Sequence, residues 1–166
     1  NDFEKGFKAS GSSASREERK ARYFEFWTKV KTKLEGQIPD FASRKVPDRQ
    51  YYGVRTGFGD CHRIIAISNR ELKVELYFGH SDPEIDESRF EALYEHKQEI
   101  EALFGDELSW EALEGRKAAR IASYRDDSSI RSIEEWDDYL TWIEDRFARL
   151  TKVTDSQVFA EAMSNA

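Results

Sequence analysis

The sequence predicts an α+β fold in which a mainly antiparallel sheet is covered by helices. Short runs of alternating apolar and polar residues indicate strands, and turn-forming residues between them indicate hairpins. Longer amphipathic stretches with helix-capping signals lie between and beyond these runs. The expected order of elements is α-β-β-β-α-β-β-α. A chain of 166 residues can bury one hydrophobic core, so we expect a single domain.

The first fifteen residues are rich in glycine and serine and predict a flexible leader or linker. A leader of this kind suggests that the domain is a piece of a longer protein. We expect the α+β domain over residues 16–153, and a helical extension or tail over residues 154–166.

Three helices are predicted by one starting signal, a serine followed three residues later by a glutamate. Such a pair forms a capping box, in which the two side chains satisfy backbone N–H groups at a helix start. The pairs are Ser15 with Glu18, Ser88 with Glu91, and Ser132 with Glu135.

Apolar residues at helical spacing follow each pair, and glycine marks the end of the first two helices at Gly36 and Gly105. The first helix is expected to bury Tyr23, Phe26, Trp27, Val30 and Leu34. The second is expected to bury Phe90, Leu93, Tyr94, Ile100 and Phe104. The third is expected to bury Trp136, Tyr139, Leu140, Ile143, Phe147 and Leu150.

Between the first two helices the apolar period changes to two. A turn at Asn69-Arg70 joins two strands, and pairing about it places Ile67 opposite Leu72 and Ile65 opposite Val74. This register makes one face apolar throughout, and a slip of one residue would destroy it. A preceding strand is expected over residues 51–56. A second hairpin is expected over residues 108–113 and 117–124, with its turn at residues 114–116.

The other face of this meander is expected to be polar. It carries one histidine, one carboxylate and several other polar or cationic side chains, namely Arg55, His62, Lys73, Glu75 and Tyr77. Gly53 should lie near Ile64 and Glu75 and leave a dip. Such a set could bind an anion or move a proton. The same residues could instead form cross-strand ion pairs on a solvated face.

A metal-dependent nuclease site is the alternative hypothesis for this region. Restriction-type nucleases place an Asp at the second strand and a Glu-x-Lys on the third, where the acids hold Mg²⁺. Here Asp60 begins the second strand, and Glu71 and Lys73 open the third. The predicted register places Asp60 and Glu71 at opposite ends of the hairpin, which argues against a shared ion.

The charge is divided unequally along the chain. Residues 1–73 contain 16 Lys and Arg against 10 Asp and Glu, whereas residues 74–166 contain 10 against 23, for a total of −7. A basic first half could bind DNA, and we expect Arg16, Arg19, Lys20, Arg22 and Arg55 on one side. Alternatively, the two halves neutralise each other within the fold.

Cysteine content indicates a reducing environment. Cys61 is the single cysteine, so no internal disulfide can form, and we expect a cytoplasmic protein. No apolar run approaches the ~20 residues that a membrane span needs, so no membrane partner is expected. Cys61, which is next to His62, could be a nucleophile, but a small buried strand residue is the favoured interpretation.

The chain resembles the bacterial and archaeal family catalogued as domain of unknown function 4268. The resemblance covers roughly residues 22–150. It is carried by Phe26-Trp27, Glu75-Leu76-Tyr77, Lys97, Ile100-Glu101, Phe104-Gly105, Leu108, Trp110, Lys117-Ala118-Ala119-Arg120-Ile121, Trp136 and Trp142. Members usually have Ile after the Glu-Leu-Tyr and Ser before the Arg-Ile, where this chain has Phe78 and Ala119.

This resemblance implies a C-terminal module that often follows a region similar to restriction-type nucleases, and so a setting in DNA metabolism or phage defence. We therefore expect a non-catalytic DNA-associated or protein-interaction module without a cofactor. The attached nuclease-like region would carry the chemistry. The alternative is a Mg²⁺-dependent nuclease that uses Asp60, Glu71 and Lys73.

Ligand-binding residues are expected among Arg55, His62, Glu75, Tyr77 and Arg120. The first choices are Glu75, Tyr77 and Arg120. Glu75 and Arg120 could instead form a structural ion pair that holds the two halves of the sheet together.

Overall fold

A five-stranded antiparallel sheet forms the centre of the fold in the computed structural model, which describes residues 2–113 and 118–166. Its strands are β1 (Tyr51–Arg55), β2 (Cys61–Ile67), β3 (Glu71–Phe78), β4 (Ser109–Leu113) and β5 (Ala118–Asp126). They lie in the order β1-β2-β3-β5-β4. The predicted α+β class and the predicted antiparallel sheet are therefore confirmed. The predicted turn at residues 114–116 lies outside the described residues.

The register predicted about the Asn69-Arg70 turn is also confirmed. Ile67 pairs with Leu72, and Ile65 pairs with Val74. All four side chains are buried, because the alternation of the strands directs them toward the helices.

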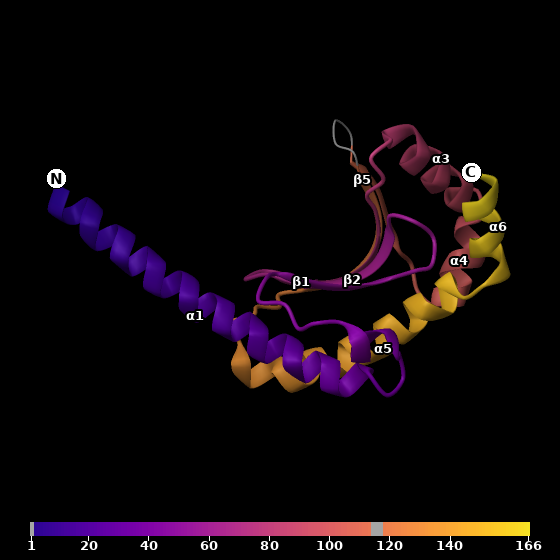
Figure 1. Ribbon diagram of the computed structural model, residues 1–166. Coiled ribbons are helices and arrows are strands. Elements are labelled where there is room, and N and C mark those ends of the chain that lie inside the picture. Colours follow the sequence, from indigo (N-terminus) through magenta and orange to yellow (C-terminus); the bar gives the residue numbers. More distant parts are fainter. Residues whose placement is uncertain (1, 114–117) are drawn as a thin grey trace.

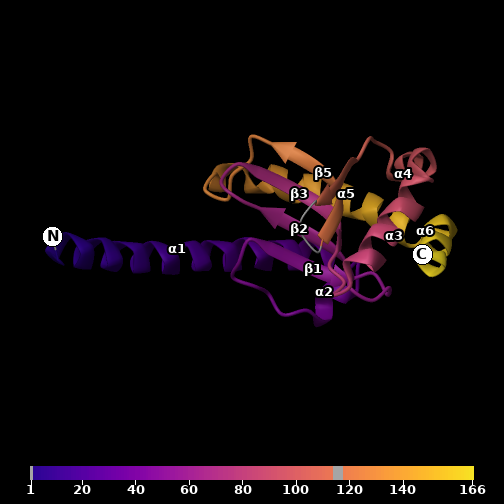
Figure 2. The ribbon, with the colours of Figure 1, turned by 90° about the horizontal axis from the view of Figure 1, so that it is seen from above.

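Helices cover one side of the sheet. They are α1 (Asp2–Leu34), α2 (Asp40–Ser43), α3 (Pro83–Tyr94), α4 (Lys97–Phe104), α5 (Trp136–Thr154) and α6 (Gln157–Asn165), with a 3₁₀ turn η1 (Ile133–Glu135) before α5. In Figure 1 the sheet is curved, with α5 and the second half of α1 beneath it and α3, α4 and α6 gathered at one end. Figure 2 shows the first half of α1 extending away from the sheet. The concave side of the sheet, here called the open face, carries no helix from the described residues.

The core is rich in aromatic side chains, as the composition predicts. All the apolar residues predicted for the first and third helices are buried in α1 and α5. Phe26 of α1 meets Trp136 edge to face with their ring centroids 5.1 Å apart, and Phe41 of α2 meets Phe147 of α5 at 5.3 Å. These contacts join α1 and α2 to α5.

The predicted helix starts are wrong in their details. α1 begins at Asp2, so Ser15 and Glu18 lie within the helix and cap nothing. Ser132 precedes η1 and its side chain makes no capping hydrogen bond. That residues 1–15 serve as a flexible leader stays a prediction.

The second predicted helix is two helices. α3 begins at Pro83, where the carboxylate of Asp82 accepts a hydrogen bond from the backbone N–H of Glu84, so Ser88 lies inside it. An aspartate cap followed by proline at the first helical position is a stronger start signal than a serine six residues later. The helix is interrupted before α4, and Tyr94 at the end of α3 is half exposed rather than buried. Gly105 ends α4 with a φ of 85°, as predicted.

The last residues of the chain pack into the core. Phe159 of α6 is buried and lies 5.5 Å from the ring centroid of Phe58, in the loop before β2. Within the described part of the chain, no helix combines the length and the apolar character required to cross a membrane.

Candidate functional site

One row of residues crosses all five strands on the open face. It consists of Arg55, His62, Tyr77, Arg120 and Glu111, each paired with the next across neighbouring strands. Four of the five predicted ligand-binding residues therefore share one row. The sheet register alone accounts for this grouping, because residues paired across strands point to the same face.

Glu75 lies in the adjacent row and is the most buried charged residue of the open face. Its carboxylate Oε2 lies 3.4 Å from Lys73 Nζ and 3.7 Å from Arg120 Nη1, and its side chain is only 7% exposed. Burial raises the pKa of Glu75 above its ordinary value, although the charges of Lys73 and Arg120 act in the opposite direction. The ion pair between Glu75 and Arg120, one of the two arrangements inferred from the sequence, thus joins β3 to β5.

The charge network continues to the edge strand β4. Arg120 Nε lies 3.7 Å from Glu111 Oε1, and the hydroxyl of Tyr124 donates a 2.6 Å hydrogen bond to Glu111 Oε2. Burial, together with that hydrogen bond, raises the pKa of Tyr124. Lys73 Nζ lies 5.8 Å from the centroid of the Tyr124 ring. The sequence pattern did not single out Glu111 or Tyr124, although Tyr124 has the same strand parity as Arg120.

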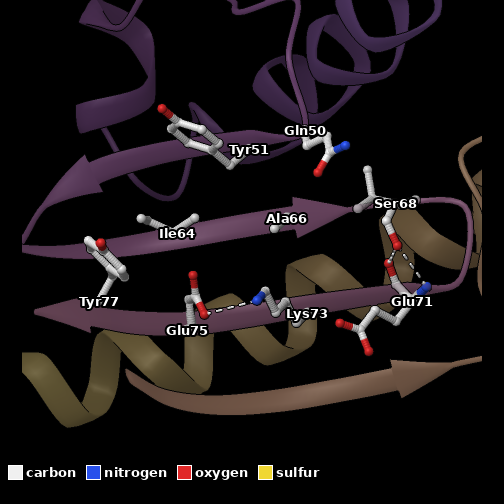
Figure 3. Close-up of a pocket in the computed structure, with 10 residues that line it drawn as sticks. Gln50, Tyr51, Ile64, Ala66, Ser68, Glu71, Lys73, Glu75 and Tyr77 are labelled. Carbon is white, nitrogen blue, oxygen red and sulfur yellow. Dashed lines mark hydrogen bonds and ion pairs between the residues drawn. The ribbon is translucent and has the colours of Figure 1, made fainter. Parts of the chain in front are cut away.

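A hollow of about 410 Å³, here called the open-face hollow, lies beside this network (Figure 3). Its lining comes from β1, β2, β3 and the turn between the last two, and consists of Gln50, Tyr51, Ile64, Ala66, Ile67, Ser68, Glu71, Lys73, Glu75 and Tyr77. Glu75 and Tyr77 of the predicted set lie in it, whereas Arg55 and His62 lie outside its lining.

Gly53 occupies the position that the sequence analysis assigned to it, in one row with Ile64 and Glu75. A Cβ atom there would lie 3.0 Å from Ile64 Cγ1 and 3.3 Å from the carbonyl oxygen of Arg63. A larger residue would therefore crowd β2, which explains glycine at this position.

The three residues of the nuclease hypothesis are not brought together. Asp60 lies in the loop before β2, with its carboxylate 3.8 Å from His80 Nε2. Cys61 pairs with Phe78, at the opposite end of the β2–β3 hairpin from Glu71. Only Glu71 and Lys73 share the open-face hollow. Among the described residues, no group of three or more His, Cys, Asp or Glu side chains is arranged to hold a metal ion.

A second hollow, of about 530 Å³, lies where α1 passes the β2–β3 turn. We call it the arginine hollow. It is lined by Ser15, Arg16, Glu18, Arg19, Arg22, Asn69 and Arg131. Arg131 comes from the acidic half of the chain and was missed by sequence analysis. The loop before it is held at the turn because the N–H groups of Ser128 and Ile130 donate to the carbonyl oxygens of Arg70 and Ser68.

The predicted basic surface is therefore correct only in part. Arg16, Arg19 and Arg22 lie together, whereas Arg55 is at the far end of β1, paired with His62. Burial, followed by the charges of Arg44 and Arg55, lowers the pKa of His62. Lys20 forms an ion pair with Glu17. Among the described residues, none of these five predicted cations forms an ion pair with residues 82–113.

Cys61 is expected to be unreactive in the folded protein. Its side chain is buried, and burial raises the pKa of the thiol to about 12, so the reactive thiolate is scarce near neutral pH. We expect DTNB to detect no reactive thiol in the folded protein. After denaturant is added, it should detect one equivalent of thiol per chain. Rapid labelling before unfolding would contradict this placement of Cys61.

Comparison with known proteins gives one match. A family model described as Domain of unknown function (DUF4268) matches residues 22–157. The matched range contains the whole sheet and the open-face hollow, and it begins at Arg22 of the arginine hollow. No curated protein and no solved structure matches the chain.

Proposed function

We propose that this chain, which belongs to the family described as Domain of unknown function (DUF4268), is a non-catalytic module that binds DNA through the arginine hollow. We place it in the cytoplasm, in a prokaryotic defence or restriction-type protein. In this proposal an attached nuclease-like region supplies the chemistry, and the module holds the nucleic acid.

The gathering of four arginines around one hollow is the observation that carries the proposal. Arg16, Arg19 and Arg22 recur every three residues along α1, and Arg131 faces them from the loop before η1. Among the described residues, Glu18 is the one acidic residue in the lining. A guanidinium group can donate two parallel hydrogen bonds to the oxygens of one phosphate. Clustered arginines therefore give affinity for a nucleic-acid backbone.

The distribution of charge supports the same surface. α3 and α4 lie away from the first half of α1 (Figure 1). These two helices carry Glu84, Asp86, Glu87, Glu91, Glu99 and Glu101. A polyanion would be repelled from that end, which in this proposal leaves the side with α1 for contact with DNA.

A further basic and aromatic region adjoins α1 and β1. A hollow of about 570 Å³ is lined by Phe24, Arg44, Lys45, Arg49 and other residues of the 43–49 loop. Phe24 is 53% exposed, and the guanidinium carbon of Arg49 lies 4.4 Å from the ring centroid of Tyr51, which is 44% exposed. Exposed rings among cations suit contact with unpaired bases as well as with phosphate.

The test is binding of fluorescently labelled duplex and single-stranded DNA, measured by anisotropy between 50 and 200 mM salt. We expect Arg19→Ala/Arg131→Ala to weaken binding about tenfold or more at the lower salt concentration, because two phosphate contacts are lost. The slope of log affinity against log salt should fall by about two units, one for each lost contact.

The matched control is Lys29→Ala/Lys152→Ala, which removes two exposed cations outside the arginine hollow and gives the same net charge. It should change affinity less than twofold. Equal losses in the two double variants, or no binding by the unaltered chain at 50 mM salt, would contradict the proposal.

A further inference from the structure

We infer that the open-face hollow is a second binding site, which takes a single unpaired nucleobase that carries an amino group. This inference rests on the proposed function, since DNA held at the arginine hollow would supply the base. Both hollows take a lining residue from the β2–β3 turn, since Ser68 lines the open-face hollow and the next residue, Asn69, lines the arginine hollow.

The carboxylate of Glu75 is the first reason. Its Oε2 is buried and has no hydrogen-bond donor among the described residues, although Lys73 and Arg120 lie at ion-pair distances from it. Figure 3 shows the other carboxylate oxygen turned toward β2, on the side of the hollow. Lys73 and Arg120 thus occupy the side of Oε2, and the second oxygen is the one that could accept a hydrogen bond from a ligand N–H group in the hollow.

The shape and lining of the hollow are the second reason. Ile64 and Ala66 of β2 form an apolar floor, with Tyr51 on one side and Tyr77 on the other (Figure 3). Gly53 has no side chain that would narrow the space beside Ile64. A flat floor with tyrosine rings at its margin suits a planar aromatic ligand.

The charges of the network exclude other classes of ligand. A cationic ligand would be repelled by Lys73 and Arg120, which already neutralise Glu75. An anionic ligand would be repelled by the carboxylate of Glu71, which also lines the hollow. The arrangement therefore selects an uncharged ligand that donates hydrogen bonds.

Among nucleobases, this selection favours those with an exocyclic amine. Adenine, cytosine and guanine each present an amino group, and carboxylates in proteins accept from such groups. Thymine and uracil present their N–H between two carbonyl oxygens, which a carboxylate repels. The inference thus predicts which nucleosides bind, independently of any phosphate contact.

The experiment is titration of the ¹⁵N-labelled chain with nucleosides that lack phosphate, followed by amide chemical shifts. Cytidine, adenosine and guanosine should shift the resonances of β2 and β3 and bind about tenfold or more tightly than uridine and thymidine. Glu75→Gln should reduce this ratio to about threefold or less, because an amide can also donate to a carbonyl oxygen. A structural defect alone would not change the ratio.

Tyr51→Ala provides a second variant that leaves the core intact, because Tyr51 is exposed. It should weaken binding of every amino-bearing nucleoside about fivefold or more through loss of stacking. Arg19→Ala/Arg131→Ala, which weakens DNA binding, should leave nucleoside binding unchanged and so serves as the control.

The outcomes separate this inference from the proposed function. If DNA binds through the arginine hollow but no nucleoside shifts β2 and β3, the inference is wrong and the proposed function stands. If the nucleosides bind with the expected preference but DNA does not, the proposed function is wrong. Uridine binding as tightly as cytidine to the unaltered chain would overturn the role given to Glu75.

Discussion

Val74→Asp is expected to lower the free energy of unfolding by about 4 kcal/mol or more. Val74 is completely buried at the middle of β3, where it pairs with Ile65 of β2 and Ser123 of β5. An aspartate there would place an unpaired carboxylate in the aromatic core between the sheet and α5. Urea unfolding followed by far-UV circular dichroism measures the change in free energy.

Two controls accompany this substitution. Val74→Ala removes methyl groups without adding charge and should cost about 1 to 3 kcal/mol. Ile133→Asp changes an apolar residue that is 54% exposed and should remain within about 0.5 kcal/mol of the unaltered protein. If Val74→Asp were as stable as Ile133→Asp, the register of the sheet would be wrong.

Trp27→Ala is expected to cost about 3 to 5 kcal/mol. Trp27 is completely buried in α1, and its ring centroid lies 5.1 Å from that of Phe26 and 5.8 Å from that of Tyr52. Its indole N–H donates a 2.6 Å hydrogen bond to the carbonyl oxygen of Arg49. Truncation would leave a large cavity and an unsatisfied carbonyl group in the loop that carries Arg49.

Trp27→Phe separates these two contributions. It keeps most of the aromatic volume but removes the indole donor, so a smaller loss of about 1 to 3 kcal/mol is expected. Chemical denaturation of both variants gives the two values. Equal losses would show that the hydrogen bond to Arg49, rather than the packing of the ring, accounts for the effect.

The sheet register could be predicted because it depends on a local pattern. Ile65 and Ile67 alternate with Ala66 and Ser68 before a short turn, and Leu72 and Val74 alternate with Lys73 and Glu75 after it. Only one pairing places the four large apolar residues on the same face. The residues that alternate with them, among them Lys73 and Glu75, then follow onto the open face. The apolar stripes of α1 and α5 were predictable for the same reason, with a period of 3.6.

The helix boundaries could not be predicted as well, since several local signals compete. Ser88 and Glu91 match a capping box, yet Asp82 and Pro83 start α3 earlier. Short polar motifs recur by chance in a chain that is 36% charged. A capping motif thus predicts a helix nearby more reliably than it predicts the first residue of that helix.

The tertiary structure alone decided which residues complete the charge network of the open face and the arginine hollow. Glu111 and Tyr124 join Glu75 and Arg120 because β5 lies between β3 and β4. The alternation of apolar and polar residues along each strand does not specify this strand order. Arg131 joins the arginines of α1 because backbone hydrogen bonds hold its loop against the β2–β3 turn. The sequence by itself determined which side chains share a face, since the alternation of a strand is local. Strand order and loop docking depend on long-range packing, so only the fold could show which charges meet.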